Sequence, residues 1–156
     1  MPFYYGTTTQ QNTNGSANTN SYTYSFIGIA GLRSVIQKVI AGSYATPADN
    51  ALLLRLYNTT TLFTPGSTVT PLPLIADAPA CALIPTTVPT IGSGVLAAIA
   101  KIQLAFNQRG TAMWAAFNAD EGIGLKAATA PNAEIIFVNQ STGTTVPLNV
   151  GVVHSE

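Results

Sequence analysis

The sequence is short of charged residues, and this shortage excludes several classes of protein. Only 8% of its 156 residues are Asp, Glu, Lys or Arg, against about 25% in an average folded protein. Six basic residues balance six acidic ones, whereas a nucleic-acid site needs clustered Lys and Arg to displace counterions. We therefore expect no nucleic-acid partner. A neutral surface also lacks the repulsion that keeps proteins apart, so the composition favours a chain that is covered by protein partners.

Cysteine and histidine are also scarce, which limits the chemistry that the chain offers. Cys81 is the only cysteine and His154 the only histidine. A single cysteine excludes an intramolecular disulfide, and on this ground we expect no cysteine-based metal site and no cofactor. Cys81 is interpreted as a small buried hydrophobic residue. His154 lies near the C-terminus, where chains usually fray, so a structural histidine is favoured over a catalytic one.

The other candidate catalytic and binding residues have simpler structural interpretations. A Ser-His-Asp or Cys-His arrangement would have to recruit the one imidazole, and no G-x-S-x-G motif is present. Asp120 and Glu121 are adjacent and are followed by Gly122 and Gly124, which is typical of a turn and not of a paired-carboxylate or calcium site. Trp114 lies among small residues and is predicted to fill the core, although an exposed Trp would stack on a sugar. We therefore expect a protein that is not an enzyme.

Long hydrophobic runs are missing as well. The longest apolar stretch, "VLAAIA" followed by Lys101 and "IQLAF", is too short and too interrupted for the roughly 20 residues that cross a bilayer. The first residues lack the basic region and the apolar run of a secretory signal. We expect no membrane partner and a protein that is made and folded in a cytoplasm.

What the sequence does contain is alternation of apolar and polar residues, which predicts half-buried β-strands. The clearest cases are "KIQLAF" (101–106) and "TVPLNVGVVH" (145–154), where Pro147 predicts an open or edge position. Five further candidates are rich in branched and aromatic residues: "SYTYSFIGI", "SVIQKVIAG", "ALLLRLYN", "TAMWAAF" and "AEIIFVN". Turn formers such as "NQRG" and "STG" separate them, and only "GSGVLAAIA" fits a helix as well as a strand. We expect an all-β fold, an antiparallel β-sandwich or jelly-roll-like body.

Residues 1–21 are predicted to form an extended N-terminal arm. From Gly6 to Ser21 the chain is Thr, Asn, Gln, Gly and Ser, apart from one Ala, and such a segment cannot bury enough apolar surface to offset its ordering entropy. Aromatic side chains at the tip of this arm would give a large contact area for few frozen torsions. We therefore expect the arm to order on binding a neighbouring subunit. The candidate interface residues are Phe3, Tyr4, Tyr5, Tyr22 and Tyr24.

The remainder, residues 22–156, is predicted to be the β-sandwich body, with one long loop at about 64–94. That segment carries most of the ten prolines, and proline removes backbone donors from a sheet. Long loops without regular structure usually carry function or contacts.

Three stretches, taken in order, resemble a known family. They are "IAGSYATPADNALLLRLYN", "AFNQRGTAMWAAFNADEGIGLK" and "AEIIFVNQSTGTTVPLNVGVVHSE". Their order and spacing are similar to those of small β-rich proteins encoded among the virion structural genes of tailed bacteriophages, the head decoration or capsid cement proteins. The likeness covers about Tyr22 to Glu156, and "ATPADNA" and "NQRGT" are its most distinctive motifs.

The resemblance implies a mechanical function. It implies a protein on the outer capsid surface of a virion, made in the cytoplasm of the bacterial host. There a homo-oligomer, a dimer or a trimer, would bind the major capsid protein and stabilise contacts between capsid subunits. Several small contacts would add up through multivalent binding. The alternative from a different class is a tail-fibre or adhesin-like β-sandwich module that binds a host-surface glycan.

Overall fold

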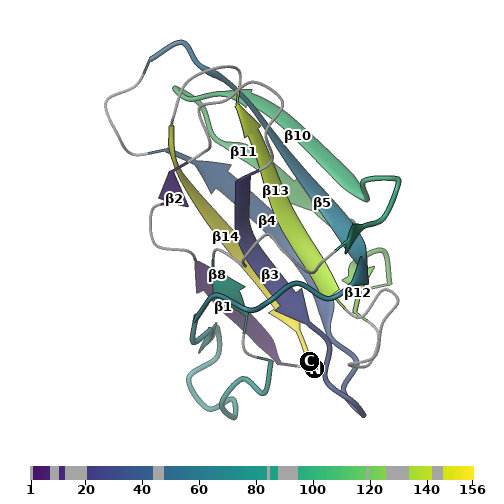
Figure 1. Ribbon diagram of the computed structural model, residues 1–156. Helices are drawn as coiled ribbons and strands as arrows, with labels where there is room; N and C mark the ends of the chain where they lie inside the picture. Colours follow the sequence, from purple (N-terminus) through teal and green to yellow (C-terminus); the bar gives the residue numbers. More distant parts are fainter. Residues whose placement is uncertain are drawn as a thin grey trace.

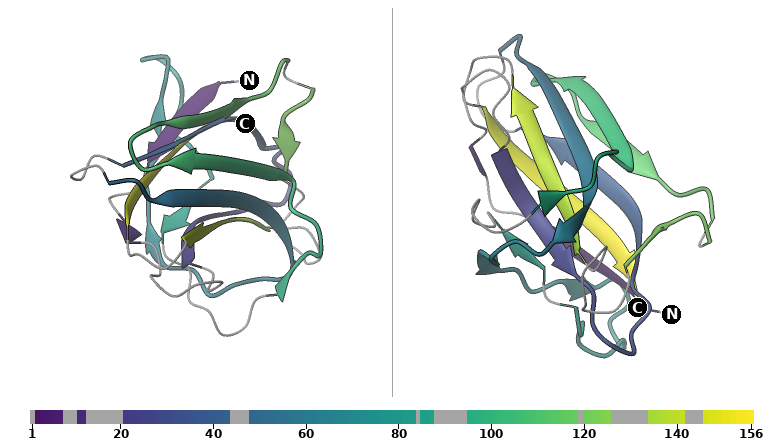
Figure 2. Two further views of the ribbon diagram at one scale, coloured as in Figure 1. Left: turned by 90° about the horizontal axis from the view of Figure 1, so that it is seen from above. Right: turned by 45° about the vertical axis from the view of Figure 1, so that its right-hand side comes forward.

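Two antiparallel β-sheets pack face to face in this computed structural model (Figure 1, Figure 2). Every regular element in the described part of the chain is a β-strand, so the predicted all-β sandwich is confirmed. No helix among these residues is long and apolar enough to span a membrane. The structure describes residues 2–7, 11–12, 21–43, 48–83, 85–87, 95–118, 120–125, 134–141 and 146–156.

The first sheet has the strand order β11-β4-β14-β1-β7, with β12 added beside β4 and β2 beside β14. Its strands are β11 (Ala112–Ala115), β4 (Val35–Gly42), β14 (Pro147–Ser155), β1 (Phe3–Thr7), β7 (Leu72–Pro73), β12 (Ile123–Gly124) and β2 (Gln11–Asn12). The second sheet has the order β10-β5-β13-β3-β8-β6, with β9 beside β5. Its strands are β10 (Ile102–Asn107), β5 (Ala51–Thr61), β13 (Glu134–Ser141), β3 (Ser21–Ile27), β8 (Thr86–Thr87), β6 (Ser67–Thr68) and β9 (Val95–Leu96).

Most connections between the long strands pass from one sheet to the other. The chain crosses between β3 and β4, between β4 and β5, between β10 and β11, and between β13 and β14. The order β1-β14-β4-β11 facing β3-β13-β5-β10 is that of a jelly roll. The predicted "NQRG" turn is present, and the Gly110 amide donates to the Asn107 carbonyl at 2.8 Å. It carries the chain from the second sheet to the first and does not close a hairpin within one sheet.

The seven segments predicted as strands are all strands, because their alternation matches the two faces of a packed sheet. Ile102, Leu104 and Phe106 of β10 point into the core, and the side chains between them are exposed. On β14 the inward residues Leu148, Val150 and Val152 are buried, as is Val146, which directly precedes the strand. Of the ambiguous "GSGVLAAIA" segment, the described part contains the short strand β9 and no helix.

Pro147 occupies an open position of β14, as predicted, although β14 is not an edge strand. β14 lies inside the first sheet, between β4 and β1. Pro147 is its first residue, and pairing with β4 begins only at Asn149. A proline is tolerated there because its missing amide is not needed by the β4 ladder.

The start of the chain is part of the body and not a free arm. β1 pairs with β14 along its whole length, from Phe3 opposite Ser155 to Thr7 opposite Gly151. Its other side pairs with β7, and the Leu74 amide also donates to the Phe3 carbonyl at 2.9 Å. β1 therefore belongs to the β-sandwich body, and the predicted assignment of residues 1–21 to an arm is wrong for Phe3–Thr7. Most of the predicted arm beyond it, residues 8–10 and 13–20, lies outside the described residues.

The proline-rich segment is a long connection, as predicted, but short pieces of it join both sheets. β7 forms the edge of the first sheet, while β6 and β8 extend the second sheet beyond β3. The Val69 amide donates to the Pro85 carbonyl at 2.8 Å, so the two ends of the segment are held together. This segment also contacts the end of β14, through the side chains of Cys81 and His154.

Candidate functional site

The five aromatic residues predicted as an interface lie on two strands and face in different directions. Tyr4 and Tyr24 point into the core and are 1% and 0% exposed. They have no surface left for a partner, which corrects the prediction for these two residues. Tyr22 is partly buried and packs against Phe63, with ring centroids 4.9 Å apart. For the other three residues, Phe3, Tyr5 and Tyr22, a role at an interface stays a prediction.

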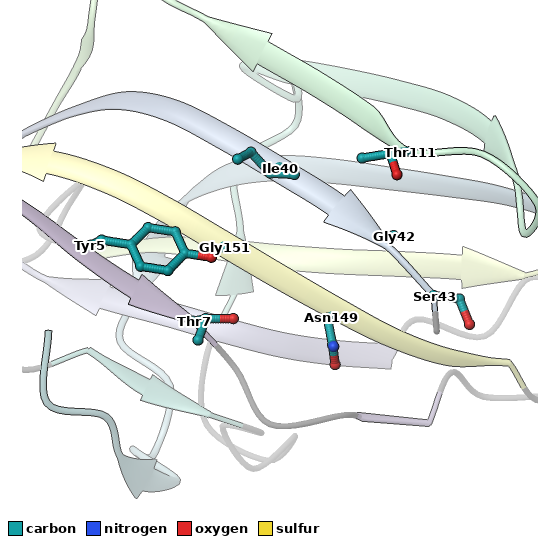
Figure 3. Close-up of a pocket in the computed structure, with 8 residues that line it drawn as sticks. All are labelled: Tyr5, Thr7, Ile40, Gly42, Ser43, Thr111, Asn149 and Gly151. Atoms are coloured by element: carbon teal, nitrogen blue, oxygen red, sulfur yellow. The ribbon is translucent and has the colours of Figure 1, made fainter. Parts of the chain in front are cut away.

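Tyr5 belongs to a shallow groove on the outer face of the first sheet (Figure 3). Its ring lies over Gly151 of the neighbouring strand. A Cβ atom at position 151 would stand 2.6 Å from the Tyr5 hydroxyl, so only glycine leaves the ring in this place. The groove has a volume of about 280 Å³ and is lined by Tyr5, Thr7, Ile40, Gly42, Ser43, Thr111, Asn149 and Gly151. Asn149 Oδ1 is buried and has no hydrogen-bonding partner among the described residues.

Around this groove the outer face of the first sheet is mostly apolar. The strand registers place Met113, Ile40 and Gly151 in one row. The next row has Ala115, Lys38, Val153, Tyr5 and Leu72. Met113 and Leu72 are 59% and 68% exposed. At the outward positions that the structure describes on β11, β4, β14 and β1, Lys38 is the one charged side chain. We call this surface the apolar face.

The outer face of the second sheet has a different chemistry. Arg55 of β5 donates from Nε to the Gln103 side-chain oxygen on β10 at 3.0 Å, and both side chains are at the surface. Lys101 precedes β10 and is exposed. An open antiparallel sheet normally keeps one face polar and solvated. The second sheet follows this rule at Arg55, Gln103 and Lys101. Elsewhere on the same face Ile136 and Val138 of β13 form a second apolar cluster, which Phe63 covers. The apolar face of the first sheet departs from the rule without such a cover.

A second candidate site lies between the sheets, at the end of β14. The Cys81 thiol lies 3.0 Å from Glu156 Oε1 and 3.3 Å from His154 Nε2, and the Nε2 and Oε1 atoms are 3.6 Å apart. His154 is fully buried, so the predicted fraying of this terminus does not occur. Cys81 is half-buried and hydrogen-bonded, and it is not the simple hydrophobic filler that was predicted. We call these three side chains the Cys81 cluster.

Each member of the cluster is held by further contacts. His154 packs between two aromatic rings: Tyr4 is stacked at a centroid distance of 5.6 Å and Phe26 is edge-on at 5.5 Å. The Glu156 carboxylate accepts the backbone amides of Ala82 at 3.0 Å and Leu83 at 2.7 Å. The last residues of β14 and the loop around Cys81 are thereby joined.

The electrostatics of the cluster follow from burial and from these hydrogen bonds. Burial, together with the hydrogen bond and negative charge of Glu156, raises the pKa of the Cys81 thiol to about 12. Burial lowers the pKa of His154, and the Glu156 carboxylate only partly opposes this effect. Burial alone would raise the pKa of Glu156, but the hydrogen bonds from Cys81, Ala82 and Leu83 outweigh it and lower the pKa. At neutral pH the cluster therefore holds a thiol, a neutral imidazole and a carboxylate.

This geometry is not that of a cysteine nucleophile with its base. In such a triad the histidine contacts the nucleophile through one ring nitrogen and the orienting acid through the other. Here Nε2 faces both Cys81 and Glu156, and Nδ1 has no partner in the described part of the chain. A thiol with a raised pKa is also a poor nucleophile. Three ligand-type atoms converge on one point instead.

The number of cysteines in the sequence does not predict this cluster, because two of its three side chains are not cysteines. His154 and Glu156 are two residues apart on one strand and so share a face, which is a signal that the sequence contains. Cys81 comes from 73 residues away, and no local pattern indicates that it lies there.

Asp120, Glu121 and Trp114 were also considered as site residues, and all three lie outside the groove and the Cys81 cluster. Asp120 and Glu121 form a turn as predicted, because both of their amides donate to Asn118 Oδ1, at 2.9 and 3.1 Å. Trp114 packs against the core from β11 and is partly buried, which agrees with its predicted role as a core residue.

Glu134 is a further buried acid, at the start of β13, and it has a structural role. It is fully buried, and its Oε2 accepts the Phe63 amide at 2.9 Å and the Thr59 hydroxyl at 3.3 Å. Burial raises the pKa of this carboxyl, although the hydrogen bonds oppose the effect. Glu134 fastens the residues after β5 to β13 and faces neither the groove nor the Cys81 cluster.

Comparison of the chain with protein-family models, with curated proteins and with solved structures finds no match. The family indicated by the sequence therefore stays a prediction.

Proposed function

We propose that the chain is a structural virion protein, a decoration or cement protein that binds the outside of a phage head and holds major capsid subunits together. The observation that carries the proposal is the apolar face of the first sheet. A monomer in water rarely exposes a large contiguous apolar surface unless the surface is used for binding. Its single charge, on Lys38, leaves little to desolvate when another protein covers it.

Within this proposal the apolar face joins copies of the chain to one another. When two such faces meet, they bury apolar side chains such as Met113, Ile40 and Leu72. The two copies of Lys38 are the like charges that this contact brings together. A standard interface buries about 800 Å² on each partner, and a few well-packed apolar side chains near its centre contribute most of the binding free energy. The partner is thus a second copy. Two identical faces in contact give a dimer, and a trimer forms if this face instead contacts a different surface of the next copy.

The contact with the shell is assigned to the loop after β7. Leu74 and Ile75 are 58% and 60% exposed and lie next to each other at the surface. Each copy in the oligomer presents one such loop, and linked copies bind with an effective concentration that multiplies weak single contacts. Contacts to several capsid subunits at once resist their separation, and this mechanism needs no cofactor.

The first experiment measures the oligomeric state by size-exclusion chromatography with light scattering. The wild-type chain is expected to be a dimer or a trimer. Met113→Lys, which places a second charge on the apolar face, is expected to give monomers. Ala105→Lys is the matched control, because Ala105 is an exposed residue of β10 on the other sheet. A monomeric wild-type chain, or equal behaviour of the two lysine variants, contradicts the assignment of this face.

The second experiment tests the shell itself. Empty heads of the phage that encodes this chain are mixed with the purified protein and separated on a density gradient. We expect the wild-type chain to sediment with the heads in a fixed ratio to the major capsid protein. Leu74→Asp with Ile75→Asp should abolish this binding, and the exposed Asp77→Asn in the same loop should not. A chain that never sediments with heads refutes the proposal.

The alternative, a module that binds a host-surface glycan, is supported by the groove beside Gly151. Sugars stack on aromatic rings and need polar partners around them, and the groove offers the Tyr5 ring with the unpartnered Asn149 oxygen. Its volume of about 280 Å³ suits one sugar ring and not a drug-sized ligand. A glycan array with Tyr5→Ala as the control tests this function. Binding that persists in the monomeric Met113→Lys variant favours it over self-association.

A further inference from the structure

We propose that Cys81, His154 and Glu156 bind one zinc ion, which joins the proline-rich segment to the end of β14. The inference is independent of the proposed function, because it rests on the interior of the sandwich and not on its outer faces.

The first support is the type and convergence of the ligand atoms. Cysteine sulfur, histidine nitrogen and carboxylate oxygen are the three kinds of atom that bind zinc in proteins. The three side chains offer one atom each, all within 4.8 Å of one another. The same imidazole nitrogen faces both other ligands, which is the arrangement that a shared ion requires.

The second support is the spacing of these atoms. Zinc bonds of about 2.3 Å to sulfur and about 2.0–2.2 Å to nitrogen and oxygen, at tetrahedral angles, place the ligand atoms about 3.4–3.6 Å apart. The sulfur–nitrogen and nitrogen–oxygen distances of 3.3 and 3.6 Å differ from the tetrahedral values by about 0.3 Å or less. The sulfur–oxygen distance of 3.0 Å must lengthen by about half an ångström, which side-chain rotation supplies without moving the strands.

The third support is the balance of charge. Binding breaks the S–H bond of Cys81, forms a Zn–S bond and releases one proton to solvent. The charges of Zn²⁺, the thiolate and the Glu156 carboxylate then sum to zero in a site where the histidine is fully buried. His154 Nδ1 lacks a partner with or without the ion, so zinc adds no unsatisfied group.

The ligands are also held in place before an ion arrives. The rings of Tyr4 and Phe26 fix the imidazole plane, and two backbone amides fix the Glu156 carboxylate. Cys81 is partly exposed, which gives an ion a path from the surface. With three protein ligands, the fourth position is left for water or for another ligand.

The test uses the purified full chain, freed of metal by a chelator and then titrated with Co²⁺ as a spectroscopic substitute for zinc. We expect one equivalent to produce a thiolate-to-cobalt charge-transfer band together with the visible bands of a tetrahedral site. Because Cys81 is the only cysteine, a thiolate band assigns the site by itself. Zinc should then displace cobalt and protect the thiol from a thiol-specific reagent.

Thermal unfolding gives a second measurement. Zinc at about 100 times its dissociation constant should raise the midpoint of wild-type unfolding by about 5 to 10 °C. Cys81→Ser should abolish the band and weaken zinc binding by about 100-fold or more, and Glu156→Gln should weaken it as well. Asp77→Asn, a carboxylate of the same segment outside the cluster, should behave as wild type.

Two outcomes overturn the proposal. One is a wild-type chain that gives no thiolate band with cobalt and no shift with zinc. The other is an equal thermal shift in Cys81→Ser, which would place the ion elsewhere. If a variant fails to fold, the wild-type cobalt spectrum and the thiol protection still decide the matter.

Discussion

Replacing Tyr4 separates a structural first strand from a free arm. Tyr4 is 1% exposed, its ring stacks on His154, and its hydroxyl donates to the Pro79 carbonyl at 3.1 Å. Tyr5, the next residue, points to the opposite face of the sheet and lies at the surface. If β1 is an integral strand, these two neighbouring tyrosines must differ sharply in their contribution to the free energy of unfolding.

The expected magnitudes follow from burial. Truncating a buried aromatic residue to alanine costs about 3–5 kcal/mol, so Tyr4→Ala should lose that much. Tyr4→Phe removes only the hydroxyl and its hydrogen bond, at a cost of about 1 kcal/mol. Tyr5→Ala should cost about 1 kcal/mol or less, because most surface substitutions have small effects. The loss at Tyr4 is a large part of the 5–15 kcal/mol that stabilises an average domain.

The assay is urea unfolding followed by the fluorescence of Trp114, the only tryptophan, which packs against the core. A chelator is present throughout, so that no metal ion contributes to the stability. Removal of residues 1–7 should destabilise the chain at least as much as Tyr4→Ala, since β14 then loses β1, one of its two long neighbours. If Tyr4→Ala and Tyr5→Ala shift the midpoint equally and slightly, β1 is a detachable arm and our description of the first sheet is wrong.

Two further predictions concern buried residues away from the candidate sites. Burial raises the pKa of Glu134, so the folded chain binds this proton more tightly than the unfolded chain. The protonated Glu134 side chain contributes its full stabilisation below a pH of about 4, which is the pKa of this group in the unfolded chain. As the pH rises from that value to the pKa in the folded chain, the free energy of unfolding falls by about 1.4 kcal/mol per pH unit. In urea unfolding at several pH values, Glu134→Gln should remove this part of the profile, and identical profiles would contradict the assignment. Separately, a Cβ at Gly6 would stand 2.6 Å from the buried Tyr24 hydroxyl, so Gly6→Ala should cost about 1–3 kcal/mol. Gly124→Ala, with no atom within 4 Å, should be neutral or slightly stabilising, and an equal loss in both variants would rule out the clash.

The sequence predicted the long strands because their signal is local. Alternation along β10 and β14 shows which side chains share a face, and burial of one face then follows from packing two sheets together. The same alternation fails for β1, whose five residues are too few to show a period and are followed by a polar run. β1 is a strand because it pairs with β14, which lies more than 140 residues further along the chain.

The candidate sites could not be predicted from the sequence, because they depend on contacts between residues that are far apart in the chain. Outward positions can be recognised on each strand, but only the sheet order brings Tyr5 next to Gly151 and Met113 next to Ile40. The Cys81 cluster depends on the path of the proline-rich segment, for which composition predicts a loop and no position. Of its members, only His154 and Glu156 are linked by the two-residue period of a strand.

The pairing of β1 with β14 also sets when the protein can fold in the cell. At a synthesis rate of about 5–20 residues per second, the ribosome needs about 7 to 30 s to proceed from Thr7 to the end of β14. During this time the aromatic first strand lacks β14, its main hydrogen-bonding neighbour, and has only the short strand β7 to pair with, while a completed sandwich folds in milliseconds to seconds. Translation, and not the folding reaction, therefore limits the appearance of the native protein.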